Sequence, residues 1–311
     1  MIKILTGNCL DKIKELEDNS IDCVVSSPPY FGLRDYGVDG QFGLEKTYQD
    51  YIANTVKVFR EFKPKLKDTA TIWWNIGDSY SSGSRTSTTN QKLRGNKDYG
   101  VTRTPVDKSI KEKDLMMIPN RVAIALQDEG WYIRSEIIWH KPNPMPESVR
   151  DRPTSCHEKI WLITKNKKYY YDADAIREPV KEISKKRIEY GLKHKHPDNI
   201  GVAIPPVNTK RMGERFLNPL GKNKRNVWTI TTKPFKDAHF ATFPKDLIEP
   251  CIKAGCPEGG TVLDPFGGSG TTGLVANDLR RNSILIELNP KYVKMMKKRM
   301  FNDSPLFMEM E

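Results

Sequence analysis

The stretch from Ile21 to Tyr30, IDCVVSSPPY, decides the fold of this chain and leads to its function. Its apolar first half indicates a short buried strand. The two prolines end that strand, because neither can donate a backbone hydrogen bond. Ser27, a rigid turn with exposed carbonyls and the ring of Tyr30 are thus expected at the carboxyl end of a strand, where open α/β sheets place ligands. Such a set suits a planar base that carries an amino group. A proline-rich turn with a packed tyrosine is the alternative.

The composition is that of a globular protein. The 311 residues are enough for one large core or two smaller ones, and 37% hydrophobic with 29% charged residues is typical of soluble proteins. No apolar stretch approaches the roughly 20 residues of a membrane helix, and Met1–Thr6 is expected to form a strand rather than a signal peptide. The five scattered cysteines favour a reducing compartment, and no metal is expected, because no zinc-ligand spacing is convincing.

The net charge of +12 is concentrated in two segments. Residues 175–235 contain 14 Lys and Arg against 5 Asp and Glu, and residues 81–113 contain 8 against 3. Basic blocks of this kind indicate a polyanionic partner whose phosphates they contact. For residues 81–113, a solvated loop is an equally good interpretation.

Strand and helix patterns alternate along the chain, which predicts an α/β fold with a doubly wound, mostly parallel sheet. The predicted strands are 1–6, 21–25, 69–76, 131–140, 159–164, 261–264 and 283–287. The predicted helices are 11–16, 48–62, 115–128, 244–254, 269–279 and 290–301.

A second motif, DPFGGSGTTG from Asp264 to Gly273, joins a predicted strand to a helix. Its Gly-x-Gly-x-x-Gly spacing fits a nicotinamide dinucleotide, but a carboxylate at Asp264 would repel the pyrophosphate of such a ligand. S-adenosylmethionine carries an ammonium, a sulfonium and a ribose but no phosphate, so it suits this loop better. Glu287, at the end of the next strand, suits ribose hydroxyls. A β–α turn without a ligand is the remaining alternative.

Together the two motifs resemble those of the DNA amino-methyltransferases. Their order resembles the β class of that family, a circular permutation of the class I methyltransferase fold. Further segments typical of the family are Trp139–Pro146, Asp151–Pro153, His157-Glu158 and His239–Pro244. The resemblance implies a site-specific DNA methyltransferase that moves a methyl group from S-adenosylmethionine to the exocyclic amine of a flipped base.

The resemblance favours cytosine N4 as the target atom, because Ser-Pro-Pro-Tyr is more similar to the cytosine-N4 enzymes than to the adenine-N6 enzymes. Adenine N6 is the alternative. Asn8 stands where the family usually has Asp, which motivates a second alternative, a DNA-binding module without catalysis. Methylation of RNA or of protein glutamine, and a dehydrogenase, are weaker alternatives.

The resemblance also implies a division of the chain. Residues 1–78 and 114–174 form the catalytic half with the target motif, and residues 79–113 are a flexible basic loop. Residues 175–235 form an inserted basic target recognition region. Residues 236–311 form the half that binds S-adenosylmethionine.

Residue roles follow from the two motifs. Ser27 Oγ and the Pro28 carbonyl are predicted to accept the N–H bonds of the target amine, with Pro29 shaping the turn and Tyr30 stacking on the base. The predicted cofactor residues at the cofactor loop and the next strand are Asp264, Phe266, Gly268, Gly270, Thr271 and Glu287. The resemblance to the family implies Asn8, Cys9, Phe240, Ala241 and Thr242 as further cofactor residues. The predicted DNA contacts are Arg34, Arg150, Arg152, Lys210, Arg211, Arg215, Lys222, Lys224 and Arg225.

Two dipeptides are expected to be structural although they suggest chemistry. Pro250-Cys251 matches the nucleophile motif of carbon-5 cytosine methyltransferases, but its helical spacing places Cys251 on an apolar face. His157-Glu158 suggests acid–base chemistry, but the pair precedes a predicted strand and the reaction needs little proton transfer. The expected partners are double-stranded DNA and a cognate restriction endonuclease, with no membrane, in the cytoplasm of a bacterial or phage-infected cell. Both a monomer and a dimer are compatible with the sequence.

Overall fold

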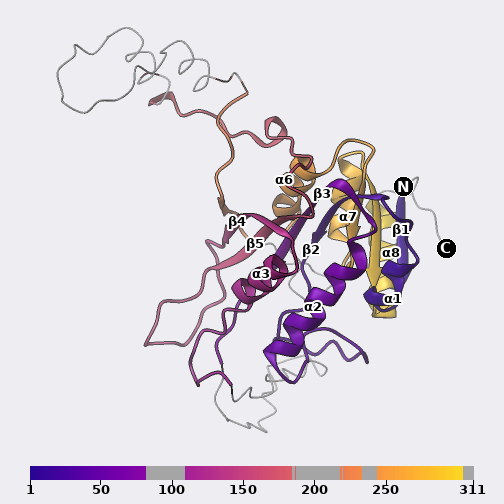
Figure 1. Ribbon diagram of the computed structural model, residues 1–311. Helices are drawn as coiled ribbons and strands as arrows, with labels where there is room; N and C mark the ends of the chain where they lie inside the picture. The colour runs from indigo at the N-terminus through magenta and orange to yellow at the C-terminus, as the bar shows by residue number, and fades with distance from the viewer. Residues whose placement is uncertain (82–108, 184–185, 187–217, 219, 233–243, 304–311) are drawn as a thin grey trace. The chain divides into compact units, whose positions relative to one another are not determined.

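The computed structural model describes residues 1–81, 109–183, 186, 218, 220–232 and 244–303 (Figure 1). The chain divides into two units. The larger comprises Met1–Tyr171 and Asn226–Glu311, and the smaller comprises Asp172–Arg225. Most of the predicted loop 79–113 lies outside the described residues.

The larger unit alternates strands and helices as the sequence predicts. Its strands are β1 (Ile2–Thr6), β2 (Ile21–Ser26), β3 (Leu66–Ile76), β4 (Tyr132–His140), β5 (His157–Thr164), β6 (Val227–Thr229), β7 (Thr261–Asp264) and β8 (Asn282–Glu287). Its helices are α1 (Cys9–Lys14), α2 (Tyr48–Phe62), α3 (Ile118–Asp128), α6 (Lys245–Gly255), α7 (Thr271–Asp278) and α8 (Pro290–Asp303).

All these strands form one sheet in the order β1-β8-β7-β2-β3-β5-β4-β6. Among the described strands, only β5 runs against its neighbours, β3 and β4. The other pairings, from β1 through β3 and between β4 and β6, are parallel. The prediction of a doubly wound, mostly parallel sheet is therefore confirmed.

Strand β2 lies between β7 and β3 in the middle of this sheet, and all six of its residues are buried. A strand covered on both faces has no solvent side, which is why Cys23, Val24 and Val25 are apolar in succession rather than alternating with polar residues. This position brings the end of β2 next to the end of β7, although the two strands are far apart in the chain.

Helices cover both faces of the sheet (Figure 1). Helices α1, α2 and α3 share one hydrophobic core with alternate residues of the strands, such as Val24, Ile72 and Trp74. Helices α7 and α8 form a second core with Ile2, Ile4 and Leu285 on the opposite face. This alternation along each strand is what a sheet between two helical layers requires.

The smaller unit has little regular structure in its described part, which contains the 3₁₀ helix η1 (Asp174–Ile176) and a bridge between Glu178 and Lys222. Arg177 joins the two segments by donating hydrogen bonds to the Gly221 carbonyl at 3.0 Å and Asn223 Oδ1 at 2.9 Å. The predicted recognition region, 175–235, extends beyond this unit, because Val227–Thr229 form the edge strand β6 of the sheet.

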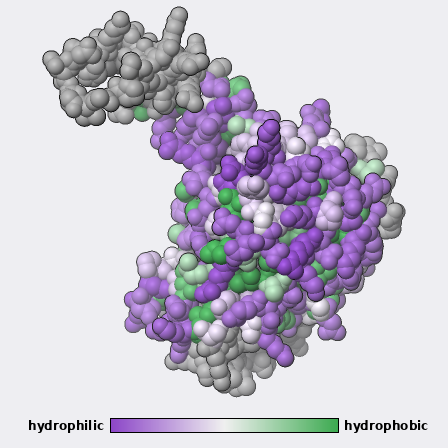
Figure 2. All heavy atoms as spheres, viewed as in Figure 1, coloured by the Kyte–Doolittle hydropathy of each residue, from purple (hydrophilic) through white to green (hydrophobic). Residues whose placement is uncertain are grey.

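The surface is mostly hydrophilic on the face shown in Figure 2, and the hydrophobic residues there form small separate patches. In the described part of the chain, no helix has the length and apolar character to span a membrane.

Candidate active site

The two sequence motifs meet at the carboxyl ends of β2 and β7. Ser26 Oγ donates a hydrogen bond of 2.6 Å to Asp264 Oδ1, across 238 positions of the sequence. Both side chains are buried, with 1% of each exposed. The bond fixes the start of the target motif relative to the start of the cofactor loop. The two motifs therefore form one site, at the sheet edge where α/β proteins bind ligands.

Helix α2 holds the target tetrapeptide through a hydrogen bond from Tyr51. Tyr51, which is fully buried, donates a hydrogen bond from its hydroxyl to the Pro29 carbonyl at 3.0 Å. Pro28 is buried, whereas Ser27 and Tyr30 are partly exposed. The proline rings fix φ at both positions, and this contact holds the Pro29 carbonyl.

Gly77 leaves the space that the ring of Tyr30 occupies. A Cβ atom at Gly77 would lie 2.6 Å from Cε2 of the Tyr30 ring, which is closer than side chains approach. The Cε2–Cδ2 edge of the ring thus lies close to the backbone just after β3. Only a residue without a side chain permits this approach.

The Tyr30 hydroxyl is the centre of a polar cluster that includes Ser27, Asn75 and Glu158. Tyr30 Oη donates to Glu158 Oε2 at 2.5 Å, and Ser27 Oγ donates to Tyr30 Oη at 3.3 Å. Asn75 Nδ2 donates to Tyr30 Oη and Glu158 Oε2, both at 2.9 Å, and to Ser27 Oγ at 3.3 Å. Lys141 forms an ion pair with Glu158 Oε1. Burial and the nearby Glu158 carboxylate raise the pKa of Tyr30 well above its usual value, so its hydroxyl stays protonated and acts as a donor.

The cofactor loop is ordered by Asp264. Its carboxylate accepts hydrogen bonds from Thr272 Oγ1 at 2.6 Å and from the Phe266 amide at 3.1 Å, besides the bond from Ser26. Burial raises the pKa of Asp264. The predicted electrostatic contact of this carboxylate with the cofactor stays a prediction. What the geometry shows is that its oxygens bind the loop.

Glu287, at the end of β8, also holds the loop. Its Oε2 accepts from the Gly268 amide and its Oε1 from the Asn289 amide, both at 2.8 Å. Burial raises the pKa of Glu287. Phe266 packs edge-on against Phe42, with ring centroids 5.2 Å apart, so the loop after the target motif contacts the cofactor loop.

Helix α8 contributes a contact that sequence reasoning missed. Arg299 donates three hydrogen bonds to the loop, to the Ser269 carbonyl at 2.9 Å, to Ser269 Oγ at 3.1 Å and to Thr271 Oγ1 at 3.0 Å. Gly270 is the N-cap of α7, with φ +78°, and a side chain there would meet Met296 at 2.6 Å. Glycine at this position thus satisfies both the turn and the close packing of α8.

Asn8 and Cys9 follow β1 at the same edge of the sheet. The Gly7 amide donates to the Glu287 carbonyl at 2.9 Å, which joins the ends of β1 and β8. Asn8 Oδ1 accepts from the Leu10 amide at 2.9 Å and so caps α1. The Cys9 thiol is buried, and burial raises its pKa to about 12, so it is an unreactive core side chain.

The structure thus brings together Ser27, Pro28, Pro29 and Tyr30 with the predicted cofactor residues Asn8, Cys9, Asp264, Phe266, Gly268, Gly270, Thr271 and Glu287. The remaining predicted cofactor residues, Phe240, Ala241 and Thr242, lie outside the described residues, as do the predicted DNA contacts Lys210, Arg211 and Arg215.

The described DNA-contact candidates belong to both units of the chain. Arg152 is bound to Glu147 at 2.6 Å, and its guanidinium lies 3.7 Å above the centre of the Tyr80 ring. In the smaller unit, Lys222 and Lys224 both pair with Glu178, at 3.3 and 3.7 Å. The further candidates Arg34, Arg150 and Arg225 remain predictions.

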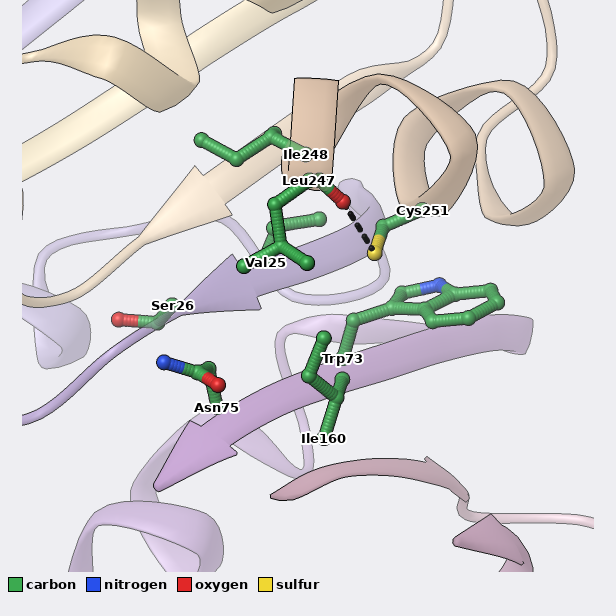
Figure 3. Close-up of a pocket in the computed structure, with 8 residues that line it drawn as sticks. All are labelled: Val25, Ser26, Trp73, Asn75, Ile160, Leu247, Ile248 and Cys251. Carbon is green, nitrogen blue, oxygen red and sulfur yellow. Dashed lines mark hydrogen bonds between the residues drawn. The ribbon is translucent and has the colours of Figure 1, made fainter. Parts of the chain in front are cut away.

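The prediction that Cys251 is a core residue is confirmed. It is 2% exposed, and its thiol donates to the Leu247 carbonyl at 3.3 Å (Figure 3). It lines a small pocket, mostly apolar, between α6 and the sheet. The residues around this pocket are Val25, Ser26, Trp73, Asn75, Ile160, Leu247, Ile248 and Cys251. Ser26 and Asn75 give it a polar end toward the active site.

Comparison with known proteins agrees with this geometry. The DNA methylase family model matches residues 21–298. Type II methyltransferase M.SmaI of Serratia marcescens is 45% identical over 298 residues, which cover 96% of this chain and 90% of that protein. Type II methyltransferase M.Cfr9I of Citrobacter freundii is 43% identical over 290 residues, 93% of this chain and 84% of that protein. The chain belongs to the DNA methylase family.

Two solved structures share the fold. The cytosine-N4-specific PvuII DNA methyltransferase has a TM-score of 0.63 at 20% identity and covers 96% of this chain and 86% of its own. A putative DNA modification methylase from Thermus thermophilus, solved in complex with S-adenosylmethionine, has a TM-score of 0.60 at 20% identity. The match covers 99% of this chain and 96% of that protein's chain.

Family membership confirms the predicted class, a DNA amino-methyltransferase that uses S-adenosylmethionine. The choice between cytosine N4 and adenine N6 and the roles of individual residues stay predictions.

Proposed function

We propose that this enzyme methylates N4 of cytosine in double-stranded DNA at a specific sequence, with Ser27, Pro28 and Tyr30 at the target base. The observation that carries the role of Ser27 is its hydrogen bonding. Its hydroxyl hydrogen is directed at Tyr30, which leaves a lone pair of Oγ as an acceptor for the amine of either base. The choice of cytosine N4 is supported by the Ser-Pro-Pro-Tyr motif and by the cytosine-N4 specificity of the PvuII enzyme, which shares the fold.

The residues of the target motif act by positioning. An exocyclic amine is a weak nucleophile because its lone pair is delocalised into the ring. Ser27 Oγ and the Pro28 carbonyl accept its two N–H bonds and so favour a tetrahedral nitrogen with a localised lone pair. Tyr30 stacks on the flipped base and sets its plane. S-adenosylmethionine, which the cofactor loop and Glu287 would hold, would supply an electrophilic methyl group and leave as S-adenosylhomocysteine. The methylated amine held by Ser27 Oγ and the Pro28 carbonyl would lose one proton to water.

The cofactor loop fits such a ligand. The carboxylates of Asp264 and Glu287 stand at the ends of β7 and β8, where a phosphate would be repelled. Phe266, which is partly exposed, offers an aromatic ring beside them. Glu287 is also partly exposed and has acceptor capacity for ribose hydroxyls.

The partners follow from the reaction. Duplex DNA is the substrate, and the basic region 175–235 is proposed to read its sequence. Because the similar proteins are Type II methyltransferases, we propose a cognate restriction endonuclease whose cleavage this methylation blocks. Methylation and cleavage would both take place in the cytoplasm, because the DNA substrate is there. DNA modified by this enzyme should resist that endonuclease, whereas unmodified DNA should be cut.

Identification of the methylated nucleoside tests the base assignment. Duplex DNA of mixed sequence is incubated with methyl-labelled S-adenosylmethionine, digested to nucleosides and analysed by mass spectrometry. N4-methylcytosine is the expected product, and N6-methyladenine would overturn the assignment. Cofactor binding without any methylated product would favour a module without catalysis.

A further inference from the structure

Glu158 reaches the target motif from strand β5, which belongs neither to the target motif nor to the cofactor loop. It lies at the start of β5, beside β3 and β4 in the sheet. Its Oε2 accepts from Tyr30 Oη at 2.5 Å and from Asn75 Nδ2 at 2.9 Å, and its Oε1 pairs with Lys141. The side chain is 15% exposed. A carboxylate this well enclosed, with every neighbour a donor, has a single preferred arrangement of hydrogen bonds.

The donors around Glu158 determine which group donates and which accepts in the neighbouring hydrogen bonds. The ionised carboxylate only accepts, and the amide nitrogen of Asn75 only donates. Tyr30 must therefore give its single hydrogen to Glu158, and the Tyr30 oxygen is left to accept from Ser27 and Asn75. As a result, the Ser27 hydroxyl hydrogen points inward, to Tyr30, and not outward toward the base.

We propose that Glu158 is a positioning residue that acts through the Tyr30 hydroxyl to keep Ser27 Oγ in its accepting orientation. The proposal rests on the proposed role of Ser27 toward the target amine. Without the carboxylate, the Tyr30 hydroxyl is free to turn and donate to Ser27. The Ser27 hydrogen then turns outward and meets the N–H of the target amine, so that one of the two acceptors is lost.

Lys141 holds Glu158 in place for this role. Its ammonium lies 4.4 Å from the centre of the Trp139 ring, and its side chain is 19% exposed. The ion pair compensates the carboxylate charge in this enclosed position. Lys141 belongs to the Trp-His-Lys-Pro segment, so the positioning accounts for a part of the sequence that the target motif and the cofactor loop leave unexplained.

A purely structural ion pair on the same two strands provides a matched control. Lys159 Nζ pairs with Glu136 Oε1 at 2.6 Å, joining β5 to β4 just as Glu158 and Lys141 join β5 to the residue after β4. Glu136→Gln removes the same charge from the same pair of strands without touching the target motif.

A double-mutant cycle between Glu158→Gln and Tyr30→Phe tests the proposal. The readout is the single-turnover rate of methyl transfer at saturating cofactor and DNA, with cofactor Kd and Tm measured in parallel. We expect Glu158→Gln to lower the rate about ten- to a hundred-fold, the size of a lost hydrogen bond to a charged group. In the Tyr30→Phe background, the same change should lower the rate less than about threefold, because the hydroxyl that transmits the effect is absent.

An equal loss in both backgrounds would overturn the proposal, because Glu158 would then act without Tyr30. An equal loss for Glu136→Gln, or a fall in Tm that accounts for the lost rate, would overturn it as well. The base assignment is tested separately. The single-turnover rate includes methyl transfer to either amine. If the product is N6-methyladenine, the cytosine proposal is refuted, but the double-mutant cycle still tests the role of Glu158.

Discussion

Substitution of Gly77 by alanine tests how tightly the geometry of the target site is set. The new Cβ would lie 2.6 Å from Tyr30 Cε2, whereas ordinary contacts begin at 3.4 Å, so the ring must withdraw by about 0.8 Å. The Gly77 backbone does not have a positive φ, so alanine itself causes no backbone strain. A shift of about this size takes the 2.9 Å bond from Asn75 to Tyr30 beyond hydrogen-bonding distance.

We expect Gly77→Ala to reduce the single-turnover methylation rate about a hundred-fold, since a misplacement of about 1 Å has this effect on an oriented reaction. Overpacking should cost about 1–3 kcal/mol of stability, and cofactor Kd should not change. Gly255→Ala is the control, because its Cβ would meet Thr71 Oγ1 at 2.3 Å, four residues before Asn75 on β3. It should lower Tm and leave the rate of the folded protein unchanged. A normal rate for Gly77→Ala, or equal loss of rate and cofactor binding, would refute the reasoning.

Three further predictions concern the cofactor side and the cysteines. Arg299→Met removes three hydrogen bonds to the cofactor loop and should raise cofactor Kd about tenfold by calorimetry, with little change in rate at saturation; an unchanged Kd would contradict this role. Asn8→Ala removes the cap of α1 and should cost about 1 kcal/mol in denaturant unfolding, whereas Asn8→Asp keeps the cap; equal losses would argue against capping. Iodoacetamide at pH 8 should modify only Cys156 in the native protein, because the other thiols are buried and burial raises the pKa of Cys9 and Cys256 to about 12. Native mass spectrometry that finds two modified thiols would show that this burial is incomplete.

The fold and the position of the site could be predicted because they depend on local patterns. Buried parallel strands are continuous apolar runs, and ligands bind at their carboxyl ends. That rule alone places Ser27, Asp264 and Glu287 at one edge of the sheet. The helix and strand boundaries agree with the predicted ones to within a few residues for the same reason.

The partners of these residues could not be predicted, because they depend on strand order. Asn75 contacts Tyr30 because β3 lies beside β2, and Glu158 does so because β5 inserts antiparallel beside β3. No local pattern specifies either neighbour. A polar Asn75 between the apolar residues Trp74 and Ile76 was the available signal. Strand β6 was not predicted, because its three residues lie in a basic, aperiodic segment and show no alternation. The strand forms only through its pairing with β4.

The structure also separates the roles of the two predicted cofactor carboxylates. Asp264 is 1% exposed, and its oxygens already accept from Ser26, Thr272 and the Phe266 amide. Glu287 is partly exposed and accepts one amide on each oxygen, which leaves a lone pair on each. We therefore expect a ligand that enters the loop to donate no hydrogen bond to Asp264 and to meet the free acceptor capacity of Glu287, while Asp264 acts through its charge and through the shape of the loop. Asp264 thus links cofactor loop and target motif, and its loss would disturb both halves of the site together, whereas loss of Glu287 would weaken the cofactor side alone.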